Sequence, residues 1–239
     1  MTIRLLASMI LMASVFSVRA DFEPYDAEYI LEKQGTRIAI AKHQLRTTGD
    51  VLQFSQFTEL SGFLSLFRDD TIHEDSGLRL GADSWRLTHY LLRQTGDAKR
   101  RDTHFDVEWN EDNSAATTEG TYIDDSFALQ TEGEIWDPLS MMLALRRDAA
   151  ADATEFRYQV VHKGDIKEYL FEREGEDQIE IDLQVYDCVI YTRVHGRRTT
   201  KMWLSEQTDL VPVRIEQYKD GELNTSMTLS SLREWNDDE

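Results

Sequence analysis

The densest group of side chains that could do chemistry lies between residues 69 and 75. Asp69, Asp70, Glu74 and Asp75 carry carboxylates there, and His73 lies among them. Carboxylate oxygens can hold a divalent cation, and two carboxylates about 5–9 Å apart can act as the acid and base of a hydrolase. The segment lacks the glycine-punctuated spacing of a calcium loop. We therefore expect a solvated loop, and a hydrolase that uses Asp69, Asp70 and Glu74 is the alternative.

Other catalytic motifs are absent from the sequence. It contains no Gly-x-Ser-x-Gly elbow, no Walker loop, no dinucleotide fingerprint and no His-Glu-x-x-His pair. Ser140 follows an Asp-Pro step, but no base can be paired with it, so we interpret it as part of a first helical turn. The lone cysteine, Cys188, lies beside apolar residues and is predicted to be a buried thiol, with a reactive thiol as the alternative. The sequence thus predicts no catalytic residue, no metal ligand and no cofactor.

Aromatic side chains are spread over nearly the whole chain and allow two interpretations. They can form an ordinary β core, or they can line a cavity for an apolar ligand. The residues predicted to form the floor of such a cavity are Trp136, Leu139, Met142, Leu143 and Trp203. Three of these belong to a helical segment that could instead fill the concavity of a sheet. The large side chains of Met142 and Leu143 favour that second role, since methionine adapts to irregular gaps in a core.

Residues 60–67 hold five large apolar side chains around one flexible glycine, Gly62. A buried strand with a bulge is the favoured interpretation, because glycine in a strand often marks a bulge. A lid or contact loop is the alternative.

These residues must be positioned mainly by strands. Apolar and polar residues alternate in many segments, for example over 179–185 and 211–216. This alternation places the apolar side chains on one face of a strand, as in a half-buried antiparallel sheet. The Asp220-Gly221 step predicts a hairpin, because a type I′ turn needs positive φ. One segment breaks the period: Asp137 can cap a helix that begins at Pro138. The predicted fold is all-β, a curved antiparallel sheet or barrel of about 10–13 strands with one short α-helix near 138–150.

Composition narrows the class of protein. The chain has 239 residues, of which 26 are Lys or Arg and 45 are Asp or Glu, so its net charge is −19. An apolar fraction of 41% is too high for a disordered chain, and one cysteine cannot build a disulfide scaffold. The negative charge would repel nucleic acid and anionic membranes. We expect a soluble monomer whose residues 21–239 form a single β-rich domain.

The N-terminus resembles a secretory signal. Arg4 precedes an apolar run over 5–16, and Val18-Arg19-Ala20 supplies a cleavage site. The run is too short to cross a bilayer, which takes about 20 apolar residues. We expect residues 1–20 to be a cleaved signal peptide, and the mature protein to be periplasmic and not membrane-spanning.

Three motifs carry a family resemblance. They are Phe22-Glu23-Pro24-Tyr25, Asp137-Pro138-Leu139-Ser140, and Met202-Trp203-Leu204 followed by Leu210-Val211-Pro212-Val213. Together they resemble the bacterial family catalogued as domain of unknown function 3108. The resemblance implies an exported protein and names no catalytic residue. The last motif is also remotely similar to a strand pair of periplasmic lipoprotein carriers, in which a half-barrel wraps a short helix.

The function predicted from these features is binding without catalysis. We expect an exported binding or envelope-assembly protein that holds an apolar or lipid-like ligand, or an envelope protein as partner. Two alternatives stay open. One is the envelope-acting hydrolase, and the other is a scaffold that contacts proteins through exposed strand edges.

Overall fold

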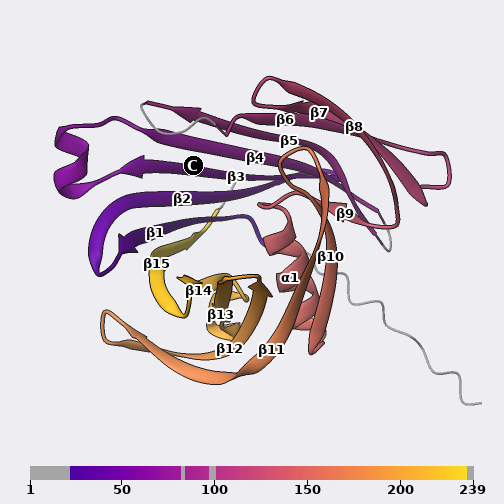
Figure 1. Ribbon diagram of the computed structural model, residues 1–239. Helices are drawn as coiled ribbons and strands as arrows, with labels where there is room; N and C mark the ends of the chain where they lie inside the picture. The colour runs from indigo at the N-terminus through magenta and orange to yellow at the C-terminus, as the bar shows by residue number, and fades with distance from the viewer. Residues whose placement is uncertain (1–21, 82–83, 97–100, 236–239) are drawn as a thin grey trace, which may run out of the picture.

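The computed structural model describes residues 22–81, 84–96 and 101–235, and in them one sheet of 15 strands. The predicted signal peptide, residues 1–20, lies outside the described residues. Figure 1 shows the sheet curling around a single short α-helix. The strands are β1 (Tyr25–Lys33), β2 (Thr36–Thr48), β3 (Val51–Leu60), β4 (Thr71–Leu80), β5 (Trp85–Thr95), β6 (Thr103–Trp109), β7 (Ala115–Tyr122), β8 (Asp125–Glu132), β9 (Ile135–Trp136), β10 (Glu155–Val161), β11 (Ile166–Ile181), β12 (Gln184–His195), β13 (Arg198–Leu204), β14 (Pro212–Lys219) and β15 (Glu222–Glu234).

The topology is nearly sequential. The strand order is β8-β7-β6-β5-β4-β3-β2-β1-β15-β14-β13-β12-β11-β10-β9, so the first and last strands pair at the centre of the sheet. The pairs are antiparallel except β9 with β10, which is parallel. Strand β9 also contacts β5, so the sheet is nearly closed. The all-β prediction is confirmed, although the sheet has more strands than predicted. Strand β9 has only two residues, so no alternation of apolar and polar residues can be recognised in it.

Residues with positive φ form both the β14–β15 turn and the β11–β12 turn, and the sequence predicts the first of them. Asp220 and Gly221 have φ values of 57° and 83°, as the predicted turn between β14 and β15 requires. The turn between β11 and β12 is built without glycine, from Asp182 at φ 48° and Leu183 at φ 71°. Residues other than glycine rarely adopt a positive φ, so the sequence pattern alone does not predict this second turn.

The helix α1 (Met141–Ala150) lies in the predicted segment, and its entry is capped by Asp137. One carboxylate oxygen of Asp137 accepts bonds from the backbone N–H of Leu139 (2.7 Å) and of Ser140 (2.9 Å). The other accepts one from the hydroxyl of Ser140 (2.7 Å). The hydroxyl of Ser76 in β4 also donates to Asp137 (2.9 Å), which ties the start of the helix to the sheet. Regular helix begins three residues after Pro138, because Met142 N–H bonds the carbonyl of Leu139 in a tighter first turn.

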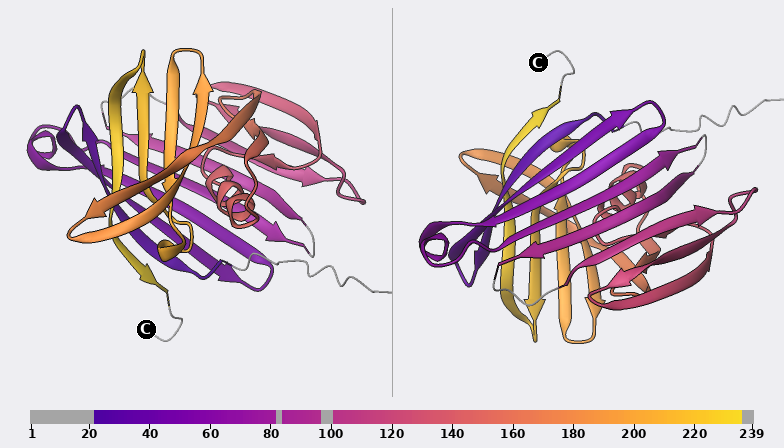
Figure 2. Two further views of the ribbon diagram at one scale, coloured as in Figure 1. Left: turned by 90° about the horizontal axis from the view of Figure 1, so that it is seen from below. Right: turned by 90° about the horizontal axis from the view of Figure 1, so that it is seen from above.

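The helix fills the concave side of the sheet (Figures 1 and 2). Residues Met141 to Arg146 are all buried. The ring of Trp136, just before the helix, contacts Trp85 and Tyr158, with ring centroids 6.3 and 6.5 Å apart. Aromatic pairs at these separations are favourable contacts of a packed core. The helix therefore has the role of a core plug.

The segment at 60–67 differs from the favoured prediction of a buried strand, which is wrong. Strand β3 ends at Leu60, and a 3₁₀ turn, η1 (Gly62–Leu66), leads toward β4. Gly62 has a φ of 66°, a left-handed conformation that ends the strand. Three side chains that follow it, Phe63, Leu66 and Phe67, are 70–74% exposed. A second 3₁₀ turn, η2 (Glu206–Thr208), follows β13. Within the described residues, no helix is long and apolar enough to span a membrane.

Candidate functional site

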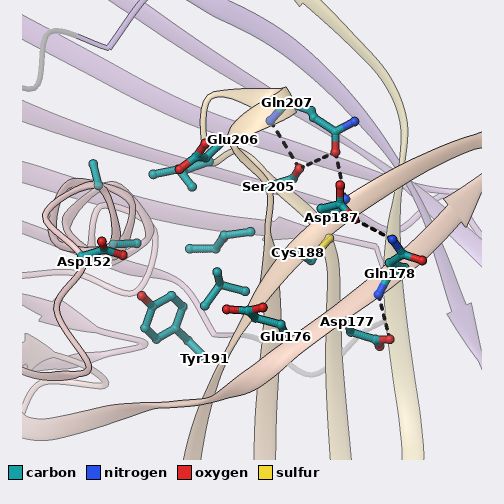
Figure 3. A pocket seen from close by; sticks show the side chains of 15 residues that line it. Asp152, Glu176, Asp177, Gln178, Asp187, Cys188, Tyr191, Ser205, Glu206 and Gln207 are labelled. Atoms are coloured by element: carbon teal, nitrogen blue, oxygen red, sulfur yellow. Dashed lines mark hydrogen bonds between the residues drawn. The ribbon is translucent and has the colours of Figure 1, made fainter.

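A groove of about 620 Å³ lies beside the C-terminal end of α1 (Figure 3). Strands β11 and β12 form one wall of the groove, and η2 with its flanking residues forms another. Its volume lies in the usual range of small-molecule sites, about 300–1,000 Å³. The 15 residues that line it are Ala149, Ala150, Asp152, Glu176, Asp177, Gln178, Asp187, Cys188, Val189, Tyr191, Leu204, Ser205, Glu206, Gln207 and Leu210.

The floor of the groove is mainly apolar. Cys188, Tyr191 and Leu204 are buried there, and Val189 and Leu210 are partly buried. The hydroxyl of Tyr191 donates to the carbonyl of Ala153 (3.1 Å), so its ring is held against the segment that follows α1. Apolar surface of this kind favours a ligand with an apolar body.

The rim of the groove is acidic. The lining residues include five carboxylates and neither Lys nor Arg within the described part of the chain; the five are Asp152, Glu176, Asp177, Asp187 and Glu206. Arg173, next to the groove, pairs with Glu176 (2.9 Å) and more loosely with Asp152 (3.7 Å). One arginine against five carboxylates leaves the rim negative. Charges of one sign around a cleft raise the local concentration of ligands of the opposite sign.

Hydrogen bonds hold η2 against the end of β12. Ser205 caps this turn by accepting from the N–H of Gln207 (3.3 Å). The side chain of Gln207 then bridges to β12: its oxygen accepts from the N–H of Asp187 (2.8 Å), and its amide nitrogen donates to the carbonyl of Val185 (3.2 Å). The groove is therefore formed before any ligand binds, which lowers the entropy lost on binding.

Cys188 is the central side chain of the floor, and its thiol is not set up as a nucleophile. Burial, and secondarily the carboxylates of Asp177 and Asp187, raise the pKa of Cys188 to about 11. The reactive form of cysteine is the thiolate. At neutral pH the thiol stays protonated, and the prediction of a buried thiol is confirmed, since only 3% of Cys188 is exposed.

The five residues predicted to bind a ligand all lie in the core. Trp136, Leu139, Met142, Leu143 and Trp203 are each buried, and none is among the residues that line the groove. Trp203 contacts one residue of the groove: its indole N–H donates to the carboxylate of Asp177 (3.2 Å). The helix contributes its last turn, Ala149 and Ala150, instead of the predicted side chains. Direct ligand contact by the five residues stays a prediction.

The prediction of a solvated loop at 69–75 is wrong for most of the stretch, because strand β4 begins at Thr71. Asp69 is exposed, whereas Asp70 is buried and pairs with Arg68 (2.5 Å). Glu74 accepts a bond from the hydroxyl of Tyr90 (2.7 Å), and burial raises the pKa of Glu74. Asp75 bonds His89 (3.1 Å) instead. Within the described chain, no group of three or more His, Cys, Asp or Glu side chains is placed to hold a metal ion.

Sequence reasoning missed most of the groove. Its rim side chains come from the end of α1, the middle of β11, the start of β12 and η2, and singly each looks like an ordinary exposed polar residue. The Gln207 bridge had no signal in the sequence at all. The available hint was the Met202-Trp203-Leu204 and Leu210-Val211-Pro212 motif, which flanks η2 on both sides.

Comparison with known proteins gives a family and a fold. Residues 24–228 match the family described as "Protein of unknown function (DUF3108)". No curated protein matches the chain. Among solved structures, the chain is similar to a beta-barrel-like protein of domain of unknown function DUF1849 from Brucella abortus, with a TM-score of 0.58 and 10% sequence identity. The match covers 90% of this chain and 98% of that one, and at this identity it shows the fold alone.

Proposed function

This chain belongs to the DUF3108 family, and we propose that it is an exported, non-enzymatic binding protein whose ligand occupies the groove over Cys188. The observation that carries the proposal is the groove itself, an apolar floor inside an acidic rim, held open by the Gln207 bridge. Export to the periplasm is supported by the charged, apolar and small-residue order of residues 1–20.

The ligand that fits this groove is an amphiphile. Its apolar body would contact Val189, Leu204 and Leu210, and a positively charged group would face the carboxylates of the rim. A lipid-like molecule or a segment of an envelope protein can present both features. An anionic head group would be repelled by the rim, since like charges near each other in a partly desolvated site are unfavourable.

The interior of the curved sheet has less space for a ligand than the groove has. The concavity is filled by Leu143 of α1, by Leu139 just before the helix and by their buried neighbours, in contact with the aromatic core. Proteins pack their interiors closely, so a side chain in such a core has no free volume for a ligand beside it. In our proposal, the predicted residues of α1 therefore support the groove by holding Ala149 and Ala150 in place, and Trp203 does so by orienting Asp177.

The test is a titration of the purified protein with three amphiphiles that share one alkyl chain. Octyltrimethylammonium is cationic, octyl glucoside is neutral and octanesulfonate is anionic. We expect the cationic probe to bind most tightly and the anionic probe most weakly. Glu206→Gln removes one rim charge and should weaken the cationic probe about two- to fivefold, as expected for one charge near a wet surface. Asp125→Asn, an exposed change in β8, is the matched control and should have no effect.

Two results would contradict this proposal. One is equal affinity for the three probes, because the acidic rim would then play no part. The other is an equal loss of cationic binding in Glu206→Gln and Asp125→Asn, because the effect would then come from net charge and not from the groove.

A further inference from the structure

The η1 turn is an apolar projection at one end of the molecule. Figures 1 and 2 show it at the far end of the β3–β4 hairpin, beyond the sheet. Phe63, Leu66 and Phe67 are 72%, 74% and 70% exposed. Single exposed apolar residues are common on proteins, but large ones gathered together usually mark a contact surface.

The turn presents these side chains in a defined arrangement. The N–H of Ser61 donates to the carbonyl of Ile38 (3.0 Å), and Arg37 donates to the hydroxyl of Ser61 (3.3 Å), so β2 anchors the base of the turn. The hydroxyl of Ser65 closes the turn on the carbonyl of Gly62 (2.8 Å). The rings of Phe63 and Phe67 lie 4.8 Å apart and contact each other. The apolar tip is thus built into the hairpin.

We propose that this tip is a lipid-surface contact, which inserts Phe63, Leu66 and Phe67 into a zwitterionic bilayer. Area is the first argument. Three such side chains expose a few hundred Å², at about 150–250 Å² for a whole aromatic residue. A stable protein interface takes about 800 Å² from each partner. A convex tip of this size is too small for a second copy of the chain, whereas a bilayer accommodates a few apolar side chains.

Charge is the second argument. Residues 60–67 carry no charged side chain, although the whole chain has a net charge of −19. The basic residues beside the tip are Arg37, at its base, and Arg68, which follows Phe67 and pairs with Asp70. The guanidinium of Arg37 lies where it can meet a lipid phosphate. The negative charge of the rest of the protein would be repelled by anionic lipids, so a bilayer of lipids without net charge is the expected partner.

The shape of the molecule agrees with a broad surface as the partner. The turn between β11 and β12 lies toward the same end as η1 in Figure 1 and in both views of Figure 2. That turn carries Leu183, which is 92% exposed. The two tips come from opposite halves of the sheet, and an extended lipid surface can meet both.

The experiment is co-sedimentation of the purified protein with phosphatidylcholine vesicles. The variant Phe63→Ser/Leu66→Ser/Phe67→Ser removes the tip, and the matched control, Val194→Ser, removes an apolar side chain that is 67% exposed near the β12–β13 turn, which projects in another direction (Figure 2). We expect the protein and the control to bind, and the triple variant to bind at least about tenfold more weakly, since it loses the apolar side chains that would leave water on binding. Replacing part of the phosphatidylcholine by phosphatidylglycerol should weaken binding.

A second readout keeps the test independent of folding. In Phe63→Cys, the new exposed thiol can be labelled selectively with an environment-sensitive fluorophore, because Cys188 is buried. The label should shift to the blue on adding the same vesicles, whereas a label at Val194→Cys should not. No binding of the unaltered protein to phosphatidylcholine, or equal binding by the triple variant, would overturn the proposal. The tip lies outside the groove, so loss of vesicle binding should leave octyltrimethylammonium binding unchanged.

Discussion

The side-chain oxygen of Gln207 accepts a hydrogen bond of 2.8 Å from the backbone N–H of Asp187, 20 residues earlier in the chain. Strand β12 pairs with β13 only from Val189 onward, so the N–H of Asp187 has no strand partner on that side. Gln207 takes the place of the missing strand. This contact fixes η2 beside β12 and so sets the width of the groove.

Replacing Gln207 tests that role. Gln207→Ala removes both side-chain bonds to β12, and we expect a loss of about 1–3 kcal/mol in unfolding free energy, at about 0.5–1.5 kcal/mol for each bond. The affinity for octyltrimethylammonium should fall as well, because the loop is no longer held. Denaturant unfolding and titration measure the two effects. Gln217→Ala, an exposed change in β14, is the control; the account fails if both variants behave alike.

The core role of α1 is tested by Met142→Ala. The side chain is buried in the hydrophobic cluster, so truncation should destabilise the protein by about 2–5 kcal/mol through lost contacts and a cavity. Binding of octyltrimethylammonium should change little, because Met142 does not line the groove. Leu223→Ala, at a partly exposed position, should cost much less. A small stability loss with altered binding would instead place Met142 beside the ligand.

His43 predicts a pH dependence of stability. The ring is fully buried, and one nitrogen bonds the side chain of Gln56 (2.6 Å). Burial lowers the pKa of His43 from 6.5 to about 4. The folded protein therefore binds this proton less readily than the unfolded chain, so stability from His43 is present above pH 6.5 and is lost as the pH falls to 4. The loss amounts to about 3 kcal/mol over that window.

The matched comparison is His43→Gln, which does not titrate. Burial raises the pKa of Asp137 to about 6, and this shift acts in the opposite direction over part of the same window. The difference in unfolding free energy between the protein and His43→Gln at each pH isolates the histidine. The unfolding free energy of the unaltered protein should fall relative to that of His43→Gln as the pH falls. A constant difference from pH 7 to pH 4 would refute the assignment.

Cys188 should be chemically inert in the folded protein. Its thiol is buried and its pKa is raised to about 11, so a water-soluble disulfide reagent at pH 7 should modify it only after unfolding. The rate of modification with and without denaturant checks this. Fast modification of the native protein would revive the reactive-thiol interpretation and with it an enzymatic reading of the groove.

The elements were predictable from local patterns, whereas the groove was not. The alternating residues of 211–216 and the Asp137 cap report local conformation, and both are found as expected. The groove depends on register. A bulge between Arg173 and Gly175 shifts β11 against β12, so that Asp177 lies opposite Cys188. A shift of one residue changes which side chains share a face, and one sequence carries no sign of it. The exposed turn at η1 corresponds to the alternative prediction for residues 60–67, a lid or contact loop, and not to the favoured buried strand. An apolar run looks alike in a core and at a tip, so the sequence did not separate the two.

The most direct test of the central claim is a map of backbone amide chemical shifts in isotope-labelled protein as octyltrimethylammonium is added. We predict that the largest shifts occur around the groove, at Val189, Leu204 and Leu210, and that the amides of Leu139 and Leu143 move little. The largest shifts at Leu139 and Leu143 would place the ligand inside the sheet instead. Shifts scattered over the surface, with no group at the groove, would contradict the assignment of a binding site there.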